Sequence, residues 1–180
     1  MHDSAPAYRA ILKVHSKLRP GFGTEAAVYG TLLVSGLIAV SSVHSETKSV
    51  AVLITVIATV LVFWGAHVYA GTIARMSDPR SGPESEHIGL GEAFRESLKH
   101  SFGMLTSAAV PSLVLLAGTT RIIPDDIAND VALWSGVIIL AILGYIAFLR
   151  RGSSQFVRII GALATASFGL MFVALKAFVH

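Results

Sequence analysis

The stretch Val50–Ala70, VAVLITVIATVLVFWGAHVYA, carries no charged residue and decides the fold. As a helix of about 21 residues at about 1.5 Å each it is about 31 Å long, which spans the hydrocarbon core of a bilayer. Its last part, FWGAHVY at residues 63–69, places one imidazole ring among aromatic side chains. The stretch therefore predicts a transmembrane helix with an ionisable group near one membrane face.

The composition agrees with a chain whose solvent is mostly lipid. Hydrophobic residues make up 53% of the sequence and charged residues only 14%, whereas soluble domains carry about 25% charged residues. Cysteine is absent, which excludes disulfides, thiolate catalysis and cysteine-ligated metal sites. No basic run alternates with aromatic residues, so we expect a lipid bilayer and no nucleic acid as the partner.

Apolar runs on both sides of Val50–Ala70 predict further membrane-spanning helices. Residues 1–20 form a polar, basic segment that reads either as an amphipathic helix on anionic lipid or as a frayed tail. Residues 89–100 form a second amphipathic segment, in which Leu90, Phe94 and Leu98 recur every four residues. We therefore expect an all-α, polytopic membrane bundle in one domain, with five spans at about residues 24–43, 50–70, 102–118, 131–149 and 157–179.

The basic residues predict the orientation of this bundle. Five spans place the N-terminus, the long loop after residue 70 and the turn at residues 150–158 on one side of the membrane. That side holds most of the 14 Lys and Arg residues, and basic residues collect on cytoplasmic loops. We expect a cell-membrane protein with a cytoplasmic N-terminus and an external C-terminus.

Four residues form the candidate site for an ion or a proton: Glu25, Tyr29, Trp64 and His67. The first two spans run in opposite directions, so Glu25 and His67 come to a similar depth. Ionisable groups inside a membrane are functional candidates by default, and a carboxylate beside an imidazole favours the charged form of both. The alternative is that Glu25 is a helix-start residue among lipid headgroups, while His67 bonds a neighbouring helix.

Small residues repeat on the last predicted span. Gly161, Thr165 and Gly169 stand four residues apart and form a surface on which another helix can pack closely. Motifs for catalysis are missing: the sequence has no His-Glu-x-x-His pair, no nucleophile elbow and no glycine-rich phosphate loop. We therefore expect no enzyme activity, no cofactor and no bound metal.

Three segments carry a resemblance to a family. VYGTLLVSGLIAV (28–40), VLVFWGAHVYA (60–70) and GALATASFGLMFVALKAFVH (161–180) resemble a family of small actinobacterial integral membrane proteins, over nearly the whole chain. This resemblance implies a five-span architecture and no particular activity. The Phe-Trp-x-x-His pattern is also similar to bacterial relatives of the lysosomal potassium channel. The Phe-Ser-Asp motif of their first helix is absent here, where Glu25–Tyr29 reads EAAVY, so no pore residue carries over.

Two classes of function fit these patterns. The first is a small channel or transporter for an ion or small solute, which forms a homo-oligomer because five spans are few for an internal repeat. The second is a non-catalytic accessory protein that binds a membrane partner through the small-residue surface or through residues 89–100. A third class, an intramembrane enzyme acting on lipid, has no motif in its favour.

Overall fold

The computed structural model of the chain describes residues 25–42, 48–77 and 89–179. The described residues form five α-helices and no strand, and 91% of them are helical. The predicted amphipathic segment at residues 1–20 lies outside them. The helices are α2 (Glu25–Ser41), α3 (Ser49–Met76), α4 (Leu90–Thr119), α5 (Asp125–Arg150) and α6 (Gln155–Val179).

Four of these helices, α3 to α6, are long and apolar enough to cross a membrane. The remaining helix, α2, is apolar but has only 17 residues, which gives a length of about 26 Å against a hydrocarbon core of about 30 Å. The count of five spans therefore stays a prediction. Residues 90–100 and the third predicted span form one continuous helix, α4.

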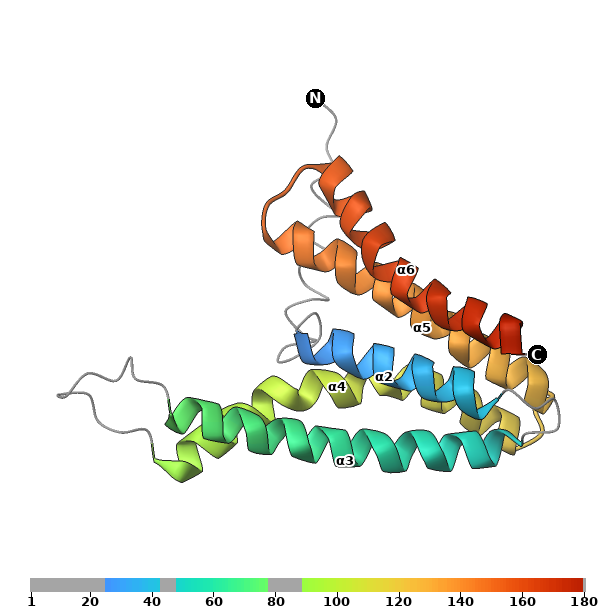
Figure 1. Cartoon of the computed structure of the whole chain (residues 1–180), viewed down its shortest axis with the longest axis horizontal. Coiled ribbons are helices and arrows are strands. Elements are labelled where there is room, and N and C mark those ends of the chain that lie inside the picture. The colour runs from blue at the N-terminus through green and yellow to red at the C-terminus, as the bar shows by residue number, and fades with distance from the viewer. Residues whose placement is uncertain (1–24, 43–47, 78–88, 180) are drawn as a thin grey trace.

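The helices alternate in direction, and α2 lies between two helix pairs (Figure 1). One pair is α3 with α4 and the other is α5 with α6, while α2 contacts all four of these helices. Among the described helices α6 contacts only α5 and α2. We call the end where α2, α4 and α6 begin the basic end. It carries Arg75, Arg95, Lys99, Arg150, Arg151 and Arg158.

Close helix approach holds the centre of the bundle together. Val34 and Ile38 of α2 are fully buried in an apolar cluster with residues of α3, α4 and α5. Gly30 allows α2 to reach α4, because a Cβ atom at Gly30 would lie only 2.8 Å from the Cα atom of Met104. Close packing of this kind is the main source of helix association in lipid, where burial of apolar surface gains little.

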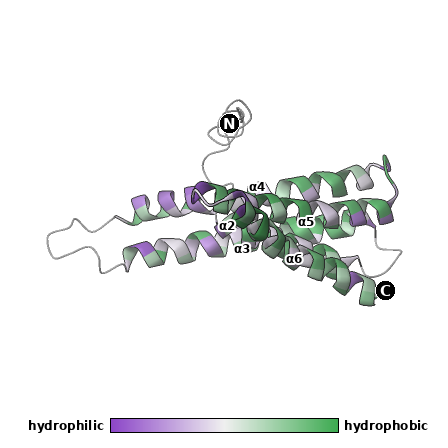
Figure 2. Ribbon diagram, turned by 90° about the horizontal axis from the view of Figure 1, so that it is seen from above, coloured by the Kyte–Doolittle hydropathy of each residue, from purple (hydrophilic) through white to green (hydrophobic). Residues whose placement is uncertain are grey.

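Hydrophilic residues gather at the two ends of the bundle, most visibly where α3 ends and α4 begins (Figure 2). At the opposite end the side chain of Asp125 accepts a hydrogen bond from the backbone N–H of Ser49 at 2.8 Å. There the Lys176 ammonium also donates to the Asp130 carboxylate at 2.6 Å, which ties the end of α6 to the start of α5. These two contacts join α3 to α5 and α5 to α6 at that end.

Candidate functional site

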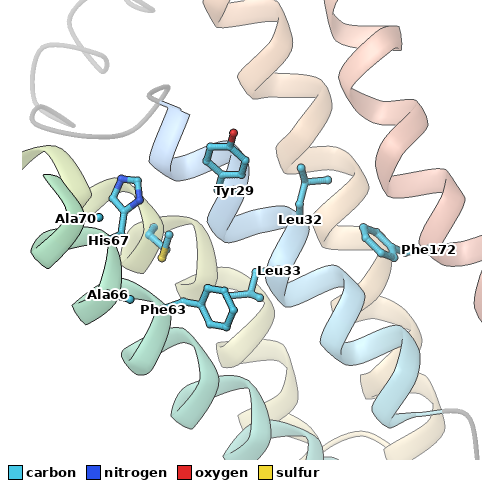
Figure 3. Close-up of a pocket in the computed structure, with 9 residues that line it drawn as sticks. Tyr29, Leu32, Leu33, Phe63, Ala66, His67, Ala70 and Phe172 are labelled. Carbon is cyan, nitrogen blue, oxygen red and sulfur yellow. The ribbon is translucent and has the colours of Figure 1, made fainter. Parts of the chain in front are cut away.

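A groove of 590 Å³ opens between α2 and α3 near the basic end (Figure 3). We call it the α2–α3 groove. Its volume lies within the range of about 300–1,000 Å³ that is typical of small-molecule sites. Helix α4 contributes one residue to its lining and α6 another. The lining consists of Tyr29, Leu32, Leu33, Phe63, Ala66, His67, Ala70, Met104 and Phe172.

Helical periodicity explains why these residues share one hollow. Residues three and four apart lie on the same face of a helix, and Phe63, Ala66, His67 and Ala70 follow that spacing along α3. Ala66 and Ala70 have only a methyl group as side chain. They therefore leave space beside the rings of Phe63 and His67 on the surface of α3. The groove is therefore a consequence of small residues on α3 opposite large ones on α2.

Two of the four predicted site residues, Tyr29 and His67, line this groove together. Figure 3 places their rings near the start of α2, with Phe63 and Leu33 farther along. His67 is half-buried, whereas Tyr29 is exposed. The other lining residues are apolar, so a phenol and an imidazole supply the polar side chains of the groove.

The other two predicted residues do not line the groove. Glu25 is exposed, and it precedes Tyr29 by one helical turn on the same face of α2. Glu25 therefore lies one turn beyond Tyr29 toward the start of α2, outside the lining of the groove. Trp64 is half-buried, and its indole N–H is shielded from solvent and has no hydrogen-bond partner among the described residues.

The charged residue of α3 nearest to His67 is directed away from the groove. Arg75 donates from one guanidinium nitrogen to the backbone oxygen of Gly71 at 3.0 Å and to the hydroxyl of Ser97 on α4 at 2.9 Å. A second nitrogen lies 3.7 Å from the carboxylate of Glu96. These contacts hold Arg75 on the α4 side of α3, and no lysine or arginine of the described residues lines the groove.

Most of the lining could not be found from the sequence. Leu32, Leu33, Met104 and Phe172 come from three different helices, and their spacing indicates only apolar spans. The one available signal is the pair Ala66 and Ala70, one turn apart on the helix face that also carries the imidazole of His67. That signal becomes a groove only when α2 is known to lie opposite.

The small-residue surface on α6 is occupied by α5. The hydroxyl of Thr165 donates to the backbone oxygen of Leu140 at 2.8 Å. A Cβ atom at Gly169 would lie 3.0 Å from the Cα atom of Val137, and one at Gly161 would overlap the ring of Phe148. This surface therefore packs within the chain and is not open to a separate protein.

No protein-family model matches the chain, and comparisons with curated proteins and with solved structures also find no match. The resemblance to small actinobacterial membrane proteins therefore stays a prediction.

Proposed function

We propose that this protein is a small membrane transporter of apolar organic cations and that the α2–α3 groove is its substrate site. The observation that carries the proposal is a groove of small-molecule size whose apolar, aromatic lining includes no lysine or arginine among the described residues. Its polar end holds Tyr29 and His67, with the carboxylate of Glu25 one turn away on α2. This combination favours a ligand with an apolar body and a positive charge.

Aromatic rings supply the first part of the electrostatic argument. Tyr29, Phe63 and Phe172 all line the groove. The face of an aromatic ring attracts a cation, by about 0.5–1 kcal/mol at exposed sites and about 2 kcal/mol when water is excluded. Three such rings around one small site give a cation several faces to contact.

Glu25 supplies the second part. A carboxylate one helical turn from the polar end of the groove attracts a cation and repels an anion. Because Arg75 is bound to α4, it does not offset this charge inside the groove. An organic cation is thus preferred over an organic anion of equal size.

A path for small inorganic ions through the centre of one chain has less support. Among the described residues, none of the buried side chains is charged, and the buried polar ones are serine, threonine and asparagine. We therefore place the substrate path along the lateral groove, and a second copy of the chain could complete it. In the proposed orientation the basic end faces the cytoplasm, so the polar end of the groove lies near the cytoplasmic leaflet.

Binding of tetraphenylphosphonium to the protein in lipid nanodiscs tests this proposal. We expect saturable binding that unlabelled tetraphenylphosphonium displaces, whereas tetraphenylborate, an anion of the same shape, does not. The Glu25→Gln variant should bind about tenfold more weakly, which corresponds to about 1.4 kcal/mol. Equilibrium dialysis with the radiolabelled cation gives both affinities.

The matched control is Glu92→Gln, which removes an exposed carboxylate from α4 at the same end of the bundle. We expect its affinity to equal that of the unchanged protein. Equal displacement by the cation and the anion would contradict the charge preference. Absence of saturable binding would contradict the site itself.

A further inference from the structure

The first three turns of α4 extend beyond the part of the bundle that fills a hydrocarbon core. With 30 residues, α4 is about 45 Å long, about 15 Å more than that core. Figure 1 and Figure 2 show the start of α4 projecting together with the end of α3 past the other helices. We call residues 90–102 the α4 arm.

One face of the α4 arm packs on α3 through small residues. Ala93, Ser97 and Ser101 follow one another at four-residue spacing and are all buried. The hydroxyl of Ser97 accepts a hydrogen bond from Arg75 of α3 at 2.9 Å and also donates to the backbone oxygen of Ala93 at 2.8 Å. These contacts fix the rotation of the arm about its own axis.

This rotation leaves a row of large apolar residues on an outer face. Leu90, Phe94, Leu98 and Phe102 also repeat every four residues, and Leu98 alone of them is half-buried. Half of the surface of Phe94 is accessible, at 50%. We call these four residues the outer row.

The outer row continues the lipid-facing side of the same helix. Ala109, Leu113 and Leu116 follow Phe102 at helical spacing and are exposed, in the part of α4 that lies within the proposed span. Arg95 and Lys99 are exposed and stand next to the row, each one position after a member of it. Apolar side chains bordered by Arg and Lys are typical of helix segments at the surface of an anionic bilayer.

We infer that the α4 arm rests on an anionic lipid leaflet, with Phe94 and Leu98 in its headgroup region and with Arg95 and Lys99 on lipid phosphates. Each basic residue near such a surface contributes about 1 kcal/mol of attraction. Continuity with the lipid-facing side of α4 favours lipid over a protein partner. The arm would then fix how deeply the basic end lies in the membrane.

Tryptophan fluorescence in vesicles tests this inference. The variant Phe94→Trp, made with Trp64→Phe and Trp134→Phe, carries one fluorophore in the outer row. In vesicles of phosphatidylcholine with phosphatidylglycerol we expect blue-shifted emission, strong quenching by lipids with a doxyl group near the headgroup, and weak quenching by acrylamide. Adding Arg95→Gln and Lys99→Gln should increase the acrylamide quenching several-fold.

The control is Glu92→Trp in the same background, because Glu92 is exposed and lies on the opposite side of the arm. We expect its tryptophan to be quenched readily by acrylamide in the same vesicles. Equal acrylamide quenching at positions 92 and 94 would overturn the inference. The outer row would then be a surface for a protein partner. Equal protection in vesicles with and without phosphatidylglycerol would overturn the role of Arg95 and Lys99.

Discussion

A single methyl group at position 144 is expected to separate α5 from α6, so that Gly144→Ala unfolds far more readily than the unchanged protein. A Cβ atom at Gly144 would lie 2.5 Å from the backbone oxygen of Gly161 and 3.0 Å from its carbonyl carbon, and it would also overlap the hydroxyl of Thr165. Backbone atoms cannot turn aside as a side chain can, so α6 must move as a unit.

Two effects lower the free energy of unfolding of Gly144→Ala. Overfilling a tightly packed contact costs about 1–3 kcal/mol. Moving α6 also removes the hydrogen bond from Thr165 to the backbone oxygen of Leu140, which is 2.8 Å long and contributes about 1 kcal/mol. We expect a total loss of about 2–4 kcal/mol in the free energy of unfolding, measured by titration of mixed micelles with dodecyl sulfate.

Gly65→Ala is the matched control for this experiment. A Cβ atom at Gly65 of α3 meets no atom of the described residues within 4 Å, and alanine favours the helix by up to about 1 kcal/mol over glycine. We expect this variant to be at least as stable as the unchanged protein. If Gly144→Ala were as stable as Gly65→Ala, the close contact between α5 and α6 would be wrong.

Filling the α2–α3 groove is expected to abolish its function without unfolding the bundle. Ala66 is exposed and lines the groove between Phe63 and His67, so the ring in Ala66→Phe occupies the space of a ligand. Because the side chain enters an open hollow rather than a packed core, we expect little change in stability. Binding of tetraphenylphosphonium should weaken by at least about tenfold, or about 1.4 kcal/mol.

Transport should fail together with binding. In vesicles that enclose DNA, entry of ethidium raises its fluorescence, and we expect Ala66→Phe to slow this entry to the rate of vesicles without protein. Ala58→Phe is the control, since Ala58 is exposed, lies about two helical turns before Ala66 along α3 and does not line the groove. A groove without a role in transport would give equal rates for the two variants.

The apolar runs were sufficient to predict an all-helical membrane protein but not the exact ends of its helices. The run that ends at Ala70 continues as helix to Met76, because Gly71 and Thr72 pack against α4 or bond within α3 rather than ending the helix. The first run was expected to span the membrane, yet α2 has 17 residues. Hydropathy reports where a chain prefers lipid, whereas the end of a helix depends on its neighbours.

Two of the four site residues predicted from the sequence line the α2–α3 groove. Glu25 and His67 were predicted to come to a similar depth because neighbouring spans run in opposite directions. Of the four predicted residues, Tyr29 and His67 line one groove, whereas Glu25 does not line it. Trp64, three residues before His67, lies outside that lining. The sequence gives no sign that Phe172 lines the groove. Phe172 reaches the groove because α6 packs against α2, and no residue pattern indicates which distant helices are in contact.

Photolabelling with ethidium monoazide shows where an apolar cation lies when it is bound. It therefore tests whether the α2–α3 groove is the binding site for apolar organic cations. The protein in nanodiscs is illuminated with the probe, and peptide mass spectrometry locates the labelled residues. We predict labels at residues 29–33 and 63–70 that excess tetraphenylphosphonium suppresses and that Ala66→Phe abolishes. Labels spread over the lipid-facing surfaces of α5 and α6 and unaffected by the competitor would contradict the claim.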